Sequence, residues 1–426
     1  MSIYPRISGH VGTTRGIRAF YPFGAQRPLG TPGVVMGMEL NGGAGFVYDP
    51  WFLRRAGIIS GPNLALMGLI GSRKSGCAKT YALRQIAHRN RRVWIFDKKP
   101  EYAAMAEAAG GTVIPLRPGG RVRLNPLDAL IVESDPERIR GARIALLEAL
   151  IGSVLGREVS PPESTALDVT LDLVVERTGA SPTLTDVAEA LLYPQEFPDA
   201  AHRAAMERDE FRQTTRVIAH ALRKLVYGKL RGMFDGPTSG DVDLERPVVV
   251  FDLSALDEDA LGIVMVCLFA WLRRRLSEVG SERPSEEDPL DMRTILIWDE
   301  AWRVMSLPGA VSFMREAWKM ARQWGLQNIA IVHALNDFLS AVSPDVRDAA
   351  MGLLKDSETK VIYRQDPSER AHLAEMGLNE AEIEVASQAL PGHGIWKIGV
   401  DRSYLVDNVA GPAELPLLDS SSREVA

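Results

Sequence analysis

The chain has 426 residues, which is enough for two or three domains or for one large α/β domain with an insertion. With 46% apolar and 24% charged residues, it has the composition of a globular protein, so a disordered or collagen-like chain is excluded. The net charge is −6 and the only cysteines are Cys77 and Cys267, so a basic nucleic-acid binder, a disulfide framework and a zinc site built from cysteines are all disfavoured.

Residues 1–60 are rich in glycine and proline with scattered aromatic residues, which predicts irregular structure and short strands. The first residues hold no apolar run of signal-peptide length, so secretion is not expected. The longest apolar run, 260–272, is shorter than the roughly 20 residues of a membrane-spanning helix and predicts a buried helix. We therefore expect a soluble, cytoplasmic protein.

Short apolar runs that alternate with helical patterns begin at residue 64. Strands are expected at 64–70, 91–97 and 111–116, then at 247–253, 294–300, 328–334 and 360–364, with a terminal hairpin at 394–399 and 403–408. Helices are expected at 77–87, 260–279, 308–324 and 367–389. Strands separated by helices are typical of βαβ units, so the predicted fold class is α/β with a mainly parallel central sheet.

Residues 131–240 follow a different pattern. Helix starts, each a serine close to a proline and followed by periodic apolar residues, are expected at 134–137, 160–163 and 181–183. The span shows no strand-like alternation, which predicts an all-α insertion. The expected division of the chain is an N-terminal segment 1–60, a core formed by 61–130 and 241–415, the insertion 131–240 and a frayed tail 416–426.

A phosphate-loop pattern follows the first predicted strand. The segment GLIGSRKS matches G-x-x-x-x-G-K-[ST] at Gly68, Lys74 and Ser75, but Arg73 stands where the second glycine belongs. In such a loop, backbone N–H groups surround the phosphates at the positive end of a helix, the lysine reaches the β- and γ-phosphates and the hydroxyl holds Mg²⁺. The candidate nucleotide-binding loop comprises Gly68, Gly71, Ser72, Arg73, Lys74, Ser75 and Gly76.

Arg73 changes this loop in two ways. It adds positive charge beside Lys74, and it gives up the conformational freedom of glycine, which Gly71 restores in part. Two interpretations stay open from the loop alone: a working phosphate loop, and a glycine-rich strand-to-helix turn that holds Lys-Ser by chance.

The run TILIWDEAW ends a predicted buried strand with two adjacent carboxylates, Asp299 and Glu300. This is the Walker B form, in which Asp299 organises Mg²⁺ and Glu300 acts as the general base on the attacking water. A strand that ends in a solvated acidic turn is the simpler alternative. Because a phosphate loop lies upstream, the two motifs together favour the binding of ATP with Mg²⁺.

Two further predicted strand ends carry polar residues. His333 ends the strand expected beside the Walker B strand, where it either senses the γ-phosphate or is satisfied locally. Asp97 and Glu101 lie in FDKKPEY after the second strand. They either face the same crevice or form a solvated loop with Lys98 and Lys99.

These motifs resemble the ATPase domain of conjugation and type IV secretion motors of the VirB/TraC type, within the HerA/FtsK class of P-loop ATPases. IWDEAW and GMFDGPT are more specific to this family than either Walker motif. The resemblance covers most of residues 35–410 and rests on FVYDPW (46–51), the phosphate loop, FDKKPEY, LNPLD (124–128), GKLRGMFDGPT (228–238), VVVFDLSAL (248–256), IWDEAW (297–302) and the strand before ALNDF.

The resemblance implies a RecA/FtsK-like P-loop fold and an ATP-driven motor. Such motors assemble as homo-hexamers at the inner face of the cell membrane, beneath the membrane-embedded subunits of a secretion channel, with DNA or protein as cargo. The roles that the resemblance implies are phosphate and Mg²⁺ binding for Lys74 and Ser75, Mg²⁺ binding for Asp299, water activation for Glu300, and an acidic pair near the site for Asp97 and Glu101.

The chain departs from this family at Arg73 and at His333, where the family usually has glycine and glutamine. Either change can slow or abolish hydrolysis while nucleotide binding persists. Larger members also carry an N-terminal domain that docks to the channel, whereas about 60 residues precede the core here. The alternatives are therefore a nucleotide-binding scaffold of the same fold and a DNA-pumping translocase of the HerA/FtsK class. Candidates for the arginine that completes a neighbour's site in a ring are Arg322, Arg364 and Arg402.

Overall fold

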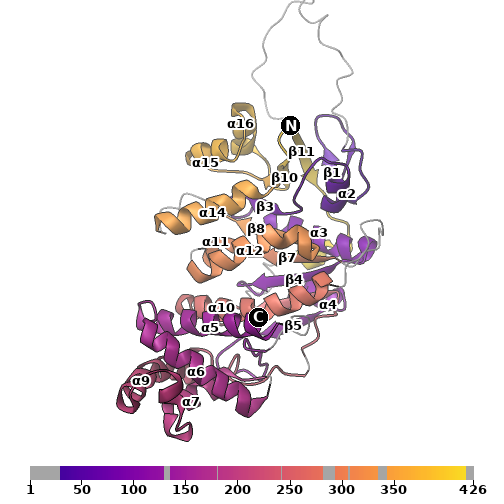
Figure 1. Ribbon diagram of the computed structural model, residues 1–426. Helices are drawn as coiled ribbons and strands as arrows, with labels where there is room; N and C mark the ends of the chain where they lie inside the picture. The colour runs from indigo at the N-terminus through magenta and orange to yellow at the C-terminus, as the bar shows by residue number, and fades with distance from the viewer. Residues whose placement is uncertain are drawn as a thin grey trace, which may run out of the picture.

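The computed structural model describes residues 29–128, 135–179, 181–240, 242–281, 293–305, 308–333 and 343–418. Their strands form one sheet in the order β2-β1-β11-β10-β9-β3-β8-β7-β4-β6-β5 (Figure 1). The strands are β1 (Val34–Glu39), β2 (Gly45–Tyr48), β3 (Leu64–Met67), β4 (Arg92–Asp97), β5 (Thr112–Pro115), β6 (Val248–Asp252), β7 (Thr294–Trp298), β8 (Leu326–Val332), β9 (Thr359–Ile362), β10 (His393–Ile398) and β11 (Arg402–Asn408).

Helices connect and cover these strands. They are α2 (Pro50–Arg55), α3 (Lys74–Arg89), α4 (Ala103–Ala108), α5 (Pro136–Leu155), α6 (Pro161–Thr178), α7 (Leu184–Leu192), α8 (Ala200–Arg203), α9 (Arg208–Lys224), α10 (Glu258–Ser281), α11 (Ala301–Met305), α12 (Pro308–Trp324), α14 (Pro344–Asp356), α15 (Arg370–Glu375), α16 (Glu380–Gln388) and α17 (Leu415–Leu418). Short helical turns are η1 (Pro194–Glu196), η2 (Leu225–Lys229) and η3 (Pro367–Glu369).

The middle of the sheet is parallel. The strands from β9 to β5 in the sheet order pair in parallel, whereas β10, β11, β1 and β2 extend the sheet with antiparallel pairs. The predicted α/β fold class with a mainly parallel sheet is confirmed, and the predicted terminal hairpin is β10–β11. The strands β1 and β2 come from the glycine-rich N-terminal region, but they join the sheet through β11, near the other end of the chain.

Alternate residues of the central strands enter two cores, one on each face of the sheet. Leu64 and Leu66 of β3 pack in the core that includes α3, whereas Ala65 and Met67 pack in the core that includes α10 and α12. Strands β3, β7 and β8 are buried at every position. Continuous apolar runs suit such strands because helices cover both faces of a parallel sheet.

Helices α5 to α9 lie in sequence between β5 and β6. They gather at the lower end of the molecule in Figure 1, where α5 contacts α10. The predicted helix starts are their N-terminal caps: Asp135 caps α5, and capping boxes join Ser160 to Glu163 and Thr183 to Asp186. Across the described part of 135–240 there is no strand.

Several helices differ from the sequence prediction. The single helix expected at 367–389 is wrong, because Gly377 with a φ of 88° follows α15 and Asn379 caps the start of α16. Helices α2, α4 and α14 have no counterpart among the predicted helices. The apolar run 260–272 lies within α10, as expected. No helix in the described ranges is both long enough and apolar enough to cross a bilayer.

Candidate nucleotide site

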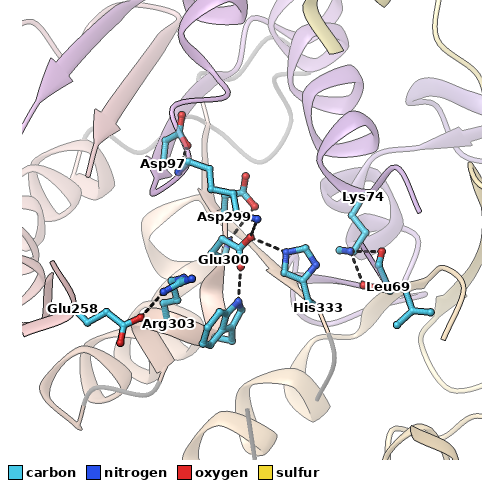
Figure 2. A network of polar contacts seen from close by, with 11 residues as sticks. Leu69, Lys74, Asp97, Glu258, Asp299, Glu300, Arg303 and His333 are labelled. Atoms are coloured by element: carbon cyan, nitrogen blue, oxygen red, sulfur yellow. Dashed lines mark hydrogen bonds and ion pairs between the residues drawn. The ribbon is translucent and has the colours of Figure 1, made fainter. Parts of the chain in front are cut away.

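Three neighbouring strands carry the predicted motifs to one edge of the sheet. Strand β8 pairs in parallel with β3 on one side and with β7 on the other, which confirms the predicted place of His333 beside the Walker B strand. Strand β3 leads into the loop 68–75, β7 into Asp299 and Glu300, and β8 into His333. Since parallel strands end at the same edge, these groups converge, as Figure 2 shows.

The loop 68–75 is held by its own backbone. Lys74 Nζ donates to the carbonyl of Leu69 at 2.8 Å and also to that of Gly68, and Ser72 Oγ donates to the Leu69 carbonyl at 2.7 Å. A Cβ at Gly68 would lie 2.7 Å from the Cβ of Tyr363, so the close approach to the residue that follows β9 requires glycine. Helix α3 begins at Lys74, and its first backbone N–H groups therefore border the loop.

Arg73 occupies a backbone conformation that suits glycine. Its φ of 71° is left-handed, which costs a residue with a Cβ about 1–2 kcal/mol. Its exposed side chain extends toward the start of β10, where a Cβ on Gly392 would lie 3.8 Å from its Nη1. The loop thus keeps a glycine-like turn at the cost of backbone strain.

The carboxylate of Glu300 contacts three side chains that come from three segments of the chain. Its Oε1 lies 2.7 Å from Nε2 of His333 and pairs with the Lys99 ammonium, and its Oε2 accepts a hydrogen bond from Trp302 Nε1. Burial raises the pKa of Glu300, but the hydrogen bonds from His333 and Lys99 outweigh it and bring the pKa down to about 2. Glu300 is 2% exposed and has a left-handed φ of 53°, a form of strain that is frequent at functional sites.

Asp299 lies deeper and is held in a different electrostatic environment. It is 4% exposed, and its Oδ1 accepts from the Glu300 N–H at 3.0 Å. Burial, followed by the charges of Glu101 and Asp97, raises its pKa to about 7. A divalent cation stabilises the ionised form of such a carboxylate, so Asp299 fits a Mg²⁺ ligand.

Within the described ranges, no three His, Cys, Asp or Glu side chains group as a metal site. Mg²⁺ at a nucleotide does not need such a group, because the ion commonly takes one or two protein ligands and completes its shell with phosphate oxygens and water. Ser75, half-buried in the first turn of α3, is the second predicted ligand.

Asp97 ends β4 and organises the turn that follows. Its carboxylate accepts from the N–H groups of Lys99 and Tyr102, each at 3.0 Å. Burial raises its pKa to about 6, although both hydrogen bonds oppose the rise. Because Asp97 shapes this turn, it sets the path of the segment that carries Lys99 to Glu300.

Lys74 and the acid pair are within electrostatic reach of one another. Burial lowers the pKa of Lys74 to about 8, and the charges of Glu300 and Asp299 oppose that change. The structure thus brings together Lys74, Asp299, Glu300 and His333, with Asp97 at the end of β4, the strand next to β7.

Two of the residues that contact Glu300, Lys99 and Trp302, were not predicted as site residues from the sequence. Lys99 is half-exposed but ion-paired, and its signal in the sequence is its position between Asp97 and Glu101 in FDKKPEY. Trp302 lies two residues after Glu300 at the start of α11. The predicted finger arginines are exposed, and the carbonyl of Arg364 accepts from Leu69 N at 2.8 Å in the phosphate loop; their role stays a prediction.

No family model matches the chain. It is 24% identical over 369 residues to a probable conjugal transfer protein TrbE of Sinorhizobium fredii (strain NBRC 101917 / NGR234), a match that covers 84% of this chain and 49% of that protein. It is 25% identical over 204 residues to the conjugal transfer protein TrbE of Rhizobium radiobacter, covering 45% of this chain and 22% of that protein. The chain thus matches half or less of these relatives' length.

Two solved structures share the fold over most of their length. VirB4 of Thermoanaerobacter pseudethanolicus superposes with a TM-score of 0.70 at 23% identity, covering 90% of this chain and 98% of that one. The plasmid coupling protein TrwB in complex with ADP and Mg²⁺ gives a TM-score of 0.57 at 14% identity, covering 91% and 96%. The two TrbE relatives, together with the fold shared with these two structures, confirm the resemblance of the chain to proteins of conjugal transfer.

Proposed function

We propose that this chain is an ATP-hydrolysing motor of a conjugative or type IV secretion system. The observation that carries the proposal is the convergence of Lys74 with Asp299 and Glu300 at strand ends on either side of β8. The relatives named for conjugal transfer and the VirB4-like fold support the cellular role.

In this proposal the loop residues Gly68 to Gly76 bind the phosphates of ATP. The Lys74 ammonium exchanges the Leu69 carbonyl for phosphate oxygens, and α3 directs its first N–H groups at them. Asp299 and Ser75 hold Mg²⁺, which supplies positive charge to the phosphates when it is bound.

Glu300 is the proposed general base. Water attacks the γ-phosphorus, the bond from phosphorus to the bridging oxygen breaks, and the water proton passes to Glu300, so that ADP and phosphate form. A carboxylate with a pKa of about 2 is a weak base. The contacts to His333 and Lys99 therefore orient Glu300, and they must loosen as it accepts the proton.

The assembly and place of the protein belong to the same proposal. We infer a homo-hexamer at the inner face of the cell membrane that acts on channel subunits, with DNA or protein as cargo. The division into segment 1–60, core 61–130 with 241–415, insertion 131–240 and tail 416–426 is retained as a proposal. It is supported by helices α5 to α9 between β5 and β6.

Phosphate release by the purified chain, with ATP and Mg²⁺, tests the enzymatic core of this proposal. We expect turnover that Glu300→Gln abolishes and that Glu210→Gln, a matched change on the exposed face of α9, leaves intact. Nucleotide binding without turnover in the unmodified chain would instead favour the nucleotide-binding scaffold. The strained backbone at Arg73, in the phosphate loop, is the observation that favours this alternative.

A DNA-pumping translocase is the second candidate, favoured by the fold shared with the coupling protein TrwB. It predicts that single-stranded or duplex DNA stimulates phosphate release and that the stimulation falls steeply with salt. Turnover that is indifferent to DNA at low salt would reject it.

A further inference from the structure

Lys99 differs from the other two side chains that contact Glu300 in its freedom to move. The side chain of Lys99 is 47% exposed, whereas that of His333, at the end of β8, is 22% exposed. A lysine ammonium stands on a flexible four-carbon stem, whereas the rings of His333 and Trp302 are attached close to the backbone. Lys99 is therefore the partner that can leave Glu300 without a rearrangement of the fold.

The backbone of Lys99 is fixed even though its side chain is half-exposed. Its N–H donates to Oδ1 of Asp97 at 3.0 Å, and the N–H of Tyr102 donates to Oδ2 of the same carboxylate at 3.0 Å. Asp97 is buried at the end of β4, and β4 pairs with β7, the strand that leads to Glu300. The turn thus holds the base of the lysine stem beside the acid pair, so that a movement of Lys99 is confined to its side chain.

The Lys99 ammonium lies within electrostatic reach of the phosphate loop. Burial lowers the pKa of Lys74 to about 8, and the positive charge of Lys99 acts in the same direction. Two ammonium groups that repel one another across a site are both attracted by an anion placed between them. A phosphate that binds to Lys74 should therefore attract Lys99 as well.

The contacts of Glu300 show what the departure of Lys99 would change. Oε1 of Glu300 contacts both Nε2 of His333 and the ammonium of Lys99. Because a carboxylate oxygen offers about two lone pairs, these two contacts occupy Oε1. When Lys99 leaves, Oε1 gains a free acceptor position while His333 and Trp302 still orient the carboxylate. A water molecule can then donate to this oxygen.

We propose that Lys99 binds the γ-phosphate of ATP, and that its ammonium moves to this phosphate from the carboxylate of Glu300. This inference rests on the proposed ATPase function. A terminal phosphate carries about −1.5 to −2 charges near pH 7, more than a carboxylate, so the exchange is favourable when ATP is bound. ADP has no γ-phosphate, and with ADP the ammonium stays on Glu300. Lys99 thus makes the release of the general base depend on the γ-phosphate.

The affinities of the full chain for ADP and for a non-hydrolysable ATP analogue, each with Mg²⁺, test this exchange by titration calorimetry. We expect Lys99→Ala to weaken binding of the analogue about fivefold to tenfold, because the γ-phosphate loses a charge-assisted partner. Binding of ADP should stay unchanged. Lys99→Arg keeps the charge and should restore part of the affinity for the analogue. Lys224→Ala, which removes an exposed lysine of α9, should alter neither affinity.

Steady-state kinetics separate phosphate binding by Lys99 from a role that only orients Glu300. If Lys99 binds the γ-phosphate, Lys99→Ala should raise KM for ATP by about the factor that the analogue loses in affinity, and should also lower kcat. An orienting role alone would lower kcat and leave both KM and the ratio of the two affinities unchanged. That result would overturn the proposal, and so would an equal weakening of both nucleotides, which would indicate general electrostatic attraction.

Failure of this inference can be told from failure of the proposed function. Turnover that Glu300→Gln abolishes, together with an affinity ratio that Lys99→Ala leaves unchanged, would refute the role of Lys99 and keep the ATPase. Binding of the analogue without turnover of ATP would refute the ATPase, and the affinity ratio in Lys99→Ala would still decide whether Lys99 binds the γ-phosphate. If the unmodified chain bound neither nucleotide, both proposals would be refuted.

Discussion

Nε2 of His333, at the end of β8, lies 2.7 Å from Oε1 of Glu300, at the end of β7. This contact ties the proposed general base to the one strand that separates it from the phosphate loop. His333 therefore reaches the proposed base from the strand that lies between β3 and β7.

Replacement of His333 tests whether it positions Glu300. We expect His333→Ala to lower kcat about tenfold to a hundredfold, because the carboxylate loses one of its orienting partners. The acid limb of the pH–rate profile should also move to higher pH, since His333 lowers the pKa of Glu300. His333→Gln, which keeps a donor, should restore most of the rate. A rate in His333→Ala equal to that of the unmodified chain would contradict the positioning role.

The backbone strain at Arg73 predicts an unusual order of stabilities. Arg73→Ala keeps a Cβ at a φ of 71° and retains the strain, whereas Arg73→Gly relieves it. After allowance for the greater freedom of glycine in the unfolded chain, we expect the glycine variant to be more stable than the alanine variant by about 1 kcal/mol. Urea unfolding followed by circular dichroism measures the difference, and an alanine variant of equal or greater stability would show that the strain is not there.

A buried amide pair joins β3 and β8 behind the nucleotide site. Asn63 Oδ1 accepts from the backbone N–H and the side-chain amide of Asn328, and Asn63 Nδ2 donates to the carbonyl of Trp318. Asn63→Ala leaves these buried groups without their partner, and we expect it to cost about 1–3 kcal/mol. Asn379→Ala, which removes an exposed cap of α16, should destabilise less. Thermal unfolding of both variants, compared with the unmodified chain, checks the order.

Acid should loosen the start of α6 before it loosens the core. Glu163 accepts hydrogen bonds from Arg157 and from the N–H of Ser160, which lower its pKa from 4.5 to about 2. Because the folded pKa is depressed, this stabilisation is present above pH 4.5 and is lost as the pH falls from there toward 2. Amide hydrogen exchange in the first turn of α6, corrected for the intrinsic rate, should rise over this range. Glu163→Gln should remove that pH dependence, and its persistence there would assign it to another group.

The local pattern of apolar residues predicted much of the fold. The runs at 64–70, 294–300 and 328–334 predicted β3, β7 and β8, because a strand buried on both faces is mostly apolar at successive positions. The prediction of one long helix at 367–389 was wrong, because the chain breaks at Gly377 between α15 and α16. The apolar periodicity continues across this break, and the backbone conformation reveals it.

The amino-acid pattern alone specifies which side chains stand at the strand ends: Lys74 after a glycine-rich turn, Asp299 and Glu300 after β7, and His333 after β8. Strand period and turn chemistry are local properties, so they can be recognised without the fold. What those side chains touch became known only from the folded arrangement. Lys99 and His333 reach Glu300 from segments far apart in sequence, and Arg293 meets α2 across more than two hundred residues, because long-range packing depends on strand order, which no local pattern encodes.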